Sequence, residues 1–153
     1  MKIKLLIMDV DGTLTDGKIY MGSNGEVMKA FNAKDGYAIL KIRDLGIEPV
    51  IITGRYSKIV ENRAKEIGVV ELHQGVTNKL ETVKEIISKY QITADNVAFI
   101  GDDVNDTECI KYCGVSACPN DAVEELYNLV DLHCHHDGGN GAIREFINYL
   151  KHK

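Results

Sequence analysis

The chain has 153 residues, of which 44% are hydrophobic and 27% charged, and its formal net charge is −5. This length is enough for one domain with a buried core, and we expect a single domain over residues 1–153. The acidic balance and the absence of a basic block argue against nucleic acid as a partner. No apolar run approaches the ~20 residues of a membrane span. Two acidic residues interrupt the first apolar stretch, so we expect a cytoplasmic protein without a signal peptide and with no membrane partner.

The first apolar run, residues 3–8, is typical of a buried parallel strand, and it ends in an acidic motif. Asp9 and Asp11 follow it two residues apart, and Gly12 lets the chain turn. A strand that ends in this way places its carboxylates at the carboxyl edge of a sheet, where open α/β sheets bind ligands. The spacing suggests a nucleophile with a proton-transfer partner, although Asp and Gly are also common in ordinary turns.

A small hairpin insertion is expected next, over about residues 17–31. Two short alternating runs flank Gly22-Ser23-Asn24-Gly25, and Asn-Gly between such runs is a strong hairpin signal. A polar loop follows, in which Asp35 is a candidate cap for a helix over roughly 35–45. The hairpin is too small to be a separate cap domain.

Strands and helices alternate along the rest of the chain. Strands are expected at 47–52, 69–72, 97–100, 115–117 and 130–132. Helices are expected at 57–66, at 77–90, around Cys109 and Ile110, after Asp121, and within the glycine-rich C-terminal tail of about 138–153. We expect Thr77 to cap the long helix and Asp121 the short one. The alternation predicts an α/β fold, a doubly wound, Rossmann-like parallel sheet with right-handed crossovers and helices on both faces.

The cysteines at positions 109, 113, 118 and 134 have no C-x-x-C spacing. A zinc site that combines them with the histidines of segment 133–136 is conceivable. We expect instead reduced thiols that pack as small apolar side chains.

Polar residues end three of the expected strands and begin one helix. The four sets are Asp9 with Asp11; Thr53 with Gly54 and Arg55; Lys79; and Asp102 with Asp103 and Asp106. Because the carboxyl ends of parallel strands share one edge, we expect these four sets to meet. Each set alone could be a turn, a surface lysine or an acidic loop, but their joint placement favours a site.

The acidic residues match the needs of phosphoryl transfer through an aspartyl-phosphate. Asp9 would attack phosphorus, and Asp11 would protonate the leaving alkoxide and then activate water. The site must neutralise the charge of its anionic substrate, and Mg²⁺ prefers hard oxygen ligands. We therefore expect Asp9 and Asp102 to supply side-chain oxygens to a magnesium ion.

The other polar residues are expected to support this chemistry. The Thr53 hydroxyl, the Gly54 amide and the Lys79 ammonium can hold phosphoryl oxygens, because phosphoryl transfer depends on positioning and charge stabilisation. Asp103 would orient a water on the metal, and Asp106 could pair with Lys79.

With this motif set, the chain resembles the haloacid dehalogenase superfamily of phosphotransferases. The match is carried, in order, by Asp9-x-Asp11-Gly12-Thr13, Thr53, Lys79 and Gly101-Asp102-Asp103-x-x-Asp106. The resemblance implies a phosphoric monoester hydrolase with the roles given above. It also implies that the backbone carbonyl of Asp11 is a further metal ligand.

Other segments resemble the capless branch of that superfamily. They are segments 14–17, 31–37, 51–55, 74–75 and 138–145, together with the hairpin. Members of this branch are typically homotetramers in which a neighbour's hairpin and glycine-rich tail help to close the site. The branch implies a keto-sugar acid phosphate as substrate. We expect 3-deoxy-D-manno-octulosonate 8-phosphate, a substrate of lipopolysaccharide biosynthesis, with a nine-carbon sialic-type sugar acid 9-phosphate as the alternative.

By the same resemblance, the positions that contact substrate are Asp11, Asn32, Lys34, Asp35, Gly36, Thr53, Gly54, Arg55, Arg63 and Lys79. Two positions depart from the octulosonate enzymes, since Lys34 stands where Arg is frequent and Leu40 replaces an often basic residue. Arg55 after Thr-Gly favours the octulosonate substrate over those sialic-type members that carry an acid there. Arg55 and Arg63 could also belong to a solvated helix face.

Two hypotheses from other functional classes stay open. A phospho-acceptor switch of the response-regulator type also uses an acidic cluster, a Thr and a Lys around Mg²⁺ on a doubly wound sheet. A former phosphatase retained as a regulatory or assembly domain is the second. Asp11, which is suited to hydrolysing the phosphoryl adduct, argues against the first, and the intact acidic set argues against the second.

Overall fold

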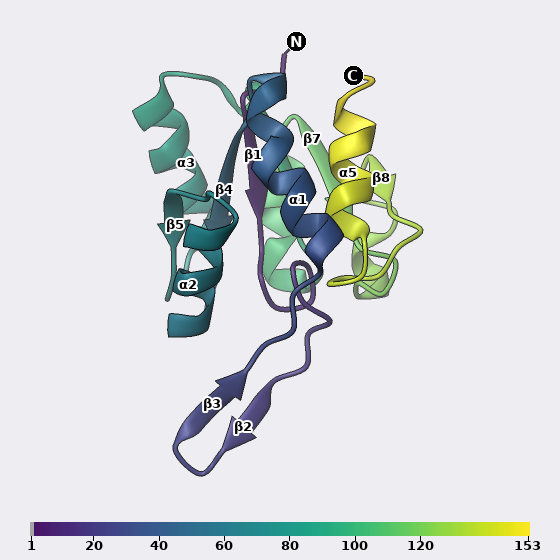
Figure 1. Ribbon diagram of the computed structural model, residues 1–153. Coiled ribbons are helices and arrows are strands. Elements are labelled where there is room, and N and C mark those ends of the chain that lie inside the picture. The colour runs from purple at the N-terminus through teal and green to yellow at the C-terminus, as the bar shows by residue number, and fades with distance from the viewer. Residues whose placement is uncertain (1) are drawn as a thin grey trace.

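A six-stranded parallel sheet lies at the centre of the computed structural model, which describes residues 2–153 (Figure 1). The strand order is β5-β4-β1-β6-β7-β8, and a separate antiparallel pair, β2-β3, forms the hairpin. The sheet strands are β1 (Leu5–Met8), β4 (Glu48–Ile52), β5 (Glu71–His73), β6 (Val97–Ile100), β7 (Val115–Cys118) and β8 (Leu132–His133), and the hairpin strands are β2 (Tyr20–Gly22) and β3 (Gly25–Met28). The predicted doubly wound α/β fold with a small hairpin insertion is confirmed.

The described part of the chain also contains five α-helices and four short 3₁₀ turns. The helices are α1 (Ala33–Lys41), α2 (Lys58–Glu66), α3 (Lys79–Tyr90), α4 (Thr107–Tyr112) and α5 (Ala142–Leu150). The 3₁₀ turns are η1 (Ile42–Leu45), η2 (Ala94–Asn96), η3 (Val104–Asp106) and η4 (Glu124–Leu126). None of the helices described has the length and apolar character needed to cross a membrane.

Alternation along the central strand β1 sends its side chains into two separate cores. Leu6 and Met8 pack with residues of α1, α2 and α5 on one face of the sheet, and Leu5 and Ile7 pack with α3 and α4 on the other. Figure 1 shows α1 and α5 side by side in front of the sheet. All four β1 side chains are fully buried. A continuous apolar run is therefore required here, as in any parallel strand covered on both faces.

Two helix caps differ from the prediction by one and three residues. Asn32, rather than Asp35, caps α1, because its side-chain oxygen accepts a hydrogen bond from the Asp35 backbone N–H at 3.0 Å. Asn78, rather than Thr77, caps α3 and accepts the backbone N–H of Glu81 at 3.1 Å. Asn, Asp and Thr are all favoured at this position, so neighbouring candidates compete on nearly equal terms.

The Asp35 carboxylate serves another helix instead. It is 1% exposed and accepts hydrogen bonds from the backbone N–H groups of Gly141 (3.3 Å) and Arg144 (3.0 Å), at the start of α5. Gly141 precedes α5 and has no side chain that could cap it. Asp35 therefore supplies, from α1, the oxygen that an N-cap residue would otherwise give.

The glycine-rich segment before α5 packs against the loop that follows β1. The Gly139 N–H donates to the Thr13 carbonyl at 3.0 Å, and the Gly138 N–H donates to the Asp121 carboxylate at 2.9 Å. A Cβ atom at Gly138 would lie 1.9 Å from the Gly12 carbonyl oxygen, so only glycine allows this approach. The prediction that Asp121 caps a helix is wrong, because its carboxylate holds this segment and η4 begins three residues later.

Smaller shifts affect three other elements. The strand predicted at 69–72 is β5 at Glu71–His73, and the strand predicted at 130–132 is β8 at Leu132–His133. The helix predicted over 35–45 is α1 followed by η1, with a tighter last turn.

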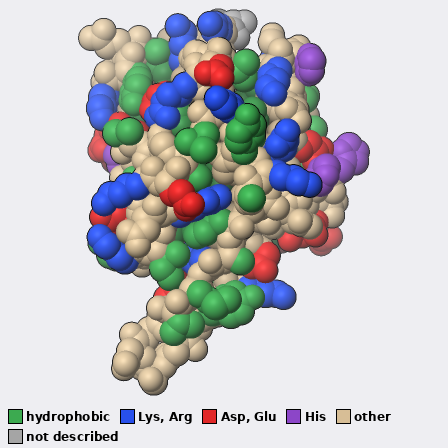
Figure 2. All heavy atoms as spheres, in the orientation of Figure 1, with side chains coloured by type: hydrophobic (Ala, Val, Ile, Leu, Met, Phe, Trp, Pro, Cys, Tyr) green, Lys and Arg blue, Asp and Glu red, His purple; other side chains and the backbone are tan. Residues whose placement is uncertain are grey.

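The hairpin extends away from the carboxyl edge of the sheet (Figure 1). Gly22 and Gly25 pair around its turn, as predicted. Hydrophobic side chains gather on this projection (Figure 2), and those exposed are Ile19, Tyr20, Met21, Val27 and Met28. Strand β3 ends at Met28, and the side chain of Lys29 then turns into the domain, where it is 1% exposed.

All four cysteines are free and buried. In residues 2–153, the one group of three or more potential metal-ligating side chains is acidic and contains neither Cys nor His. The described residues therefore offer no zinc site, and the cysteines pack as apolar side chains.

Candidate active site

The predicted polar sets meet in a cleft of about 170 Å³ at the carboxyl edge of the sheet. Its walls come from the loops after β1, β4 and β6 and from the first residue of α3. The lining residues are Asp9, Asp11, Thr53, Gly54, Arg55, Lys79, Asp102, Asp103 and Asn105. Asn105 is an addition, since sequence analysis did not distinguish it from a loop residue.

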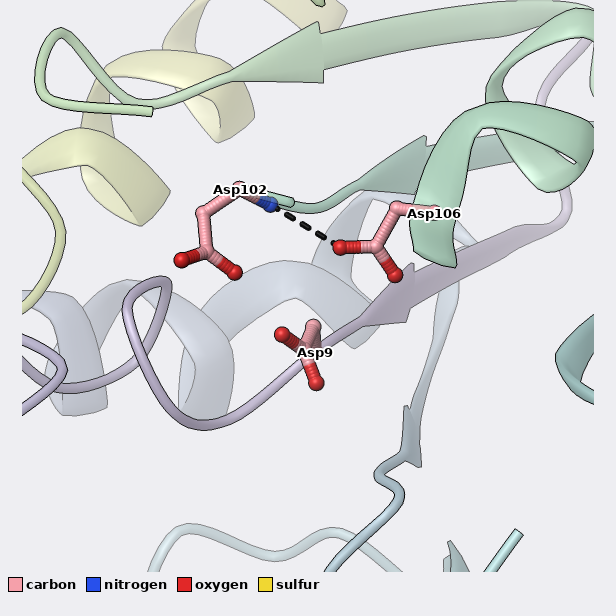
Figure 3. Close-up of side chains that lie close together, drawn as sticks. All are labelled: Asp9, Asp102 and Asp106. Atoms are coloured by element: carbon pink, nitrogen blue, oxygen red, sulfur yellow. Dashed lines mark hydrogen bonds between the residues drawn. The ribbon is translucent and has the colours of Figure 1, made fainter. Parts of the chain in front are cut away.

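Three carboxylates form the centre of this site. Figure 3 shows Asp9, Asp102 and Asp106 pointing toward one another from the ends of β1 and β6 and from η3. One oxygen of each lies within 4.8 Å of the others. Burial, a hydrogen bond with Asp9 and the surrounding negative charges raise the pKa of Asp102 to about 9. The site therefore gathers more negative charge than its own side chains neutralise.

Gly12 allows this close approach of the β1 and β6 loops. Its φ is +88°, and a Cβ atom there would lie 1.8 Å from Oδ2 of Asp102. Any other residue at this position would displace the Asp102 carboxylate. The Thr15 hydroxyl accepts the backbone N–H groups of Gly12 (3.2 Å) and Gly17 (3.1 Å), which fixes the turn.

Lys79 is the cation inside the acidic cluster. Its Nζ lies 3.0 Å from Oδ1 of Asp9 and 2.8 Å from Oδ1 of Asp106. Burial alone would lower the pKa of Lys79, but the two carboxylates outweigh it and raise that pKa. The ammonium form is therefore kept, and the pairing of Asp106 with Lys79 is as predicted.

Asp106 also organises the loop after β6. Its Oδ2 accepts the backbone N–H of Asp102 at 3.0 Å and that of Asp103 at 3.3 Å. Both Asp106 oxygens are thus engaged inside the protein. Asp103 is exposed at the cleft, and its Oδ1 accepts the Val104 N–H at 2.7 Å.

Asp11 is held by the predicted Arg55 and by a lysine that sequence analysis did not identify. Lys29 Nζ donates to its Oδ1 at 2.5 Å, and Arg55 Nε lies 3.9 Å from its Oδ2. Lys29 also pairs with Glu26 at 3.0 Å. Both new residues come from the hairpin, where charged side chains ordinarily face solvent. No spacing or composition signal distinguishes these two from other hairpin charges.

The remaining predicted substrate residues lie outside this cleft. Asn32 and Lys34 line a separate hollow of about 640 Å³ beside α5. Asp35 is buried against α5, as described above. Arg63 donates to the Asn32 carbonyl at 3.2 Å and packs on Gly36, where a Cβ atom would lie 2.4 Å from Arg63 Nη2. Within one chain, these five residues do not join the polar residues that line the cleft.

The donor set of the cleft fits a hard divalent cation. Asp9 and Asp102 offer carboxylate oxygens in a cluster whose charge the single ammonium of Lys79 does not balance. Mg²⁺ is commonly bound through one or two carboxylates while it keeps positions for phosphate and water.

Comparison with known proteins agrees with this chemistry. The family model described as haloacid dehalogenase-like hydrolase matches residues 56–147. The 3-deoxy-D-manno-octulosonate 8-phosphate phosphatase KdsC of Salmonella typhi is 46% identical over 148 residues, which are 97% of this chain and 79% of the relative.

Two solved structures extend the similarity to three dimensions. The 3-deoxy-D-manno-octulosonate 8-phosphate phosphatase of Moraxella catarrhalis, in complex with magnesium, phosphate and a KDO molecule, has a TM-score of 0.93 and 37% identity, covering 97% of this chain and 85% of that chain. The cobalt-bound deoxy-D-mannose-octulosonate 8-phosphate phosphatase of Haemophilus influenzae has a TM-score of 0.95 and 34% identity, covering 99% and 88%.

The family model covers more than half of this chain, and the relatives align along nearly all of it. The parallel sheet of this chain presents an acidic pair, a Thr, a Lys and a second acidic loop at one edge, as the sequence motifs predict. The chain is a phosphatase, and it belongs to the haloacid dehalogenase-like hydrolases.

Proposed function

We propose that this phosphatase hydrolyses 3-deoxy-D-manno-octulosonate 8-phosphate to the free sugar acid and inorganic phosphate, through an aspartyl-phosphate and with Mg²⁺. The observation that carries the mechanism is the position of Asp9, whose Oδ1 is held by Lys79 at 3.0 Å in a cleft that Asp11 also lines. The identity of 46% with an enzyme named for this substrate supports the choice of sugar.

In the first step, a carboxylate oxygen of Asp9 attacks phosphorus and the bond from phosphorus to the sugar oxygen breaks. Asp11 donates a proton to the departing alkoxide, so the sugar acid leaves as a neutral alcohol at that oxygen. Lys79 fixes the orientation of the nucleophile and, with Thr53 and the Gly54 amide, faces the phosphoryl oxygens.

In the second step, water attacks the phosphorus of the aspartyl-phosphate. Asp11, now a carboxylate, takes a proton from that water, the bond between phosphorus and Asp9 breaks, and phosphate departs. The original carboxylate of Asp9 and the protonated Asp11 are thereby restored.

Asp9, Asp102 and the backbone carbonyl of Asp11 would hold Mg²⁺. When bound, the ion neutralises the charge of the phosphoryl oxygens and of the carboxylates around them. Asp103 would hydrogen-bond water at the mouth of the cleft, and Asp106 would keep Lys79 and the β6 loop in place.

The sugar end of the substrate needs cations beyond the phosphate site. The Arg55 side chain is 48% exposed at the cleft, and its guanidinium is suited to the sugar carboxylate. Lys34 lines an open hollow, so it could reach substrate bound to another subunit. We keep four neighbouring residues in the proposed substrate region because they shape the loop that carries Lys34. They are Asn32, Asp35, Gly36 and Arg63.

We propose that residues 1–153 act as one phosphatase domain within a homotetramer, where a neighbour's hairpin and tail help to close the cleft. The exposed apolar side chains of the hairpin, Met21 and Val27 among them, support such an assembly. The four free cysteines agree with a reducing cytoplasm. Sedimentation equilibrium of the wild type and of Met21→Lys tests the tetramer, with dissociation expected for the variant.

A substrate panel tests the proposed reaction. Phosphate release is measured with 3-deoxy-D-manno-octulosonate 8-phosphate, a nine-carbon sialic-type sugar acid 9-phosphate and glucose 6-phosphate. We expect kcat/KM to be highest for the first compound and to exceed that for glucose 6-phosphate by about 10- to 100-fold, because a hydrogen bond to the carboxylate that glucose 6-phosphate lacks is worth about 1.5–3 kcal/mol. Equal rates would reject the substrate, and preference for the nine-carbon compound would establish the alternative.

Asp9→Asn tests the nucleophile, with Asp44→Asn, an exposed carboxylate on η1, as the matched control. We expect the first variant to lose turnover and the control to keep it. A wild-type phosphoenzyme that persists for minutes would instead support a phospho-acceptor switch.

A further inference from the structure

The hairpin reaches the catalytic centre through one buried side chain. Lys29 Nζ lies 2.5 Å from Oδ1 of Asp11 and 3.0 Å from Oε2 of Glu26. The Lys29 side chain is 1% exposed, so its ammonium is shut off from solvent. A buried ammonium is costly unless its partners are well placed, and here it has two carboxylates. Lys29 therefore holds a defined position between the hairpin and the acid–base residue.

Glu26 is fixed in turn from the body of the domain. The Ser57 hydroxyl donates to its Oε1 at 2.6 Å, and Arg55 Nη2 lies 3.8 Å from its Oε2. The Ser57 backbone N–H donates to the side-chain oxygen of Gln74 at 3.0 Å, which anchors the start of α2. Burial alone would raise the pKa of Glu26, but Ser57, Lys29 and Arg55 together lower it. A continuous polar chain thus runs from α2 through the hairpin to Asp11.

The two carboxylate oxygens of Asp11 have different surroundings in this arrangement. Oδ1 is occupied by Lys29, whereas the ion-pair partner of Oδ2 among residues 2–153 is Arg55, whose Nε lies 3.9 Å away. Asp11 lines the cleft, so Oδ2 is the oxygen available to the leaving alcohol and to water.

We propose that Lys29 is a positioning residue, which fixes the Asp11 carboxylate so that Oδ2 faces the reacting oxygen, and that Glu26 and Ser57 fix Lys29. The proposal rests on the acid–base role given to Asp11 in the proposed function. Lys29 does not contact substrate, and it acts through Asp11.

The effect of the leaving group on the activity loss distinguishes two roles of Lys29, the positioning of Asp11 and the mere attachment of the hairpin to the domain. A sugar alkoxide needs a proton as it departs, whereas p-nitrophenolate leaves without one. For Lys29→Met, kcat/KM should fall on the order of 100-fold with the sugar phosphate and less than about 5-fold with p-nitrophenyl phosphate. Lys18→Met, an exposed lysine of the same hairpin, is the matched control and should change neither value. An equal loss with both phosphates would overturn the proposal.

A double-mutant cycle gives a second readout. If Lys29 acts through Asp11, then Lys29→Met should lower the residual activity of Asp11→Asn by less than about 2-fold, because the group that it positions is already lost. Independent, multiplying losses would contradict the proposal. Glu26→Gln removes the second carboxylate without changing its size. It should show a smaller loss with the same leaving-group pattern, which keeps the test available where Lys29→Met fails to fold.

The outcomes also separate this proposal from the proposed function. Full activity of Asp11→Asn toward alkyl phosphates would remove the acid–base role itself. An inactive Asp11→Asn together with a fully active Lys29→Met would reject only the positioning role of Lys29.

Discussion

Lys79 and Asp106 form an ion pair of 2.8 Å in which the two side chains are 4% and 0% exposed. The same ammonium lies 3.0 Å from Asp9, so it is the cation shared by two of the three clustered carboxylates. Removal of this cation leaves those carboxylates facing one another in a buried site.

Lys79→Met should therefore unfold more easily than the wild type. We expect the free energy of unfolding to fall by about 3–5 kcal/mol, because one partner of a buried ion pair is lost. Urea denaturation in EDTA at pH 7 measures the change. Lys41→Met, an exposed lysine at the end of α1, should stay within about 0.5 kcal/mol of the wild type. A similar small change in Lys79→Met would show that the pair adds little.

Mg²⁺ should stabilise the wild type through the carboxylates of Asp9 and Asp102. At 100 times its dissociation constant, a ligand adds about 2.7 kcal/mol, which corresponds to roughly 5–10 °C in Tm for a domain of this size. Asp102→Asn should lose this increase, yet in EDTA it should melt no lower than the wild type, because a carboxylate with a pKa of about 9 has been replaced by a neutral group. Thermal melts with and without MgCl₂ test both statements, and Asp44→Asn should keep the wild-type response.

Glu145 should make stability depend on acid pH. Its carboxylate accepts the backbone N–H groups of His135 and His136 and lies within 2.9 Å of Nδ1 of both rings. Burial alone would raise its pKa, but these hydrogen bonds outweigh it and hold the pKa of Glu145 at about 2. The folded state therefore favours the ionised form. The stabilisation is complete above the ordinary pKa of 4.5 and is lost as pH falls toward 2.

The matching variant is Glu145→Gln. At pH 7 we expect it to lower the free energy of unfolding on the order of 1–2 kcal/mol, as for hydrogen bonds to a charged group. The difference from wild type should shrink between pH 4.5 and 2, as urea denaturation at several pH values would reveal. Glu85→Gln, an exposed residue of α3, serves as the control. A difference that does not vary with pH would contradict the assignment.

Asp35→Ala should loosen the start of α5. The carboxylate caps that helix from a residue 109 positions away from Arg144 in the sequence. Loss of a cap costs about 1–2 kcal/mol, and the amides of Gly141 and Arg144 should exchange hydrogen faster. Hydrogen exchange of the variant against Asp44→Ala checks this, and unchanged protection of both amides would contradict it.

Sequence patterns predicted the features that depend on neighbouring residues. The buried run before Asp9, the turn at Gly22–Gly25 and the polar ends of β4 and β6 are local signals, and they led to the fold and to the residues of the cleft. The Asp35 contact and the path of Lys29 into the site depend on how distant segments fold back. Neither contact produces a periodicity or a spacing in the sequence. A single Asp or Lys reads the same in the sequence whether its side chain faces solvent or contacts another segment.

The packing of Gly138 and Gly139 against the loop after β1 joins almost the last part of this chain to nearly the first. On a ribosome, the Asp9 motif leaves the exit tunnel long before the glycines that complete its surroundings are synthesised. A nascent chain therefore carries Asp9 in a loop whose packing partners have yet to emerge, and the surroundings of that loop are complete only when most of the described chain has been synthesised.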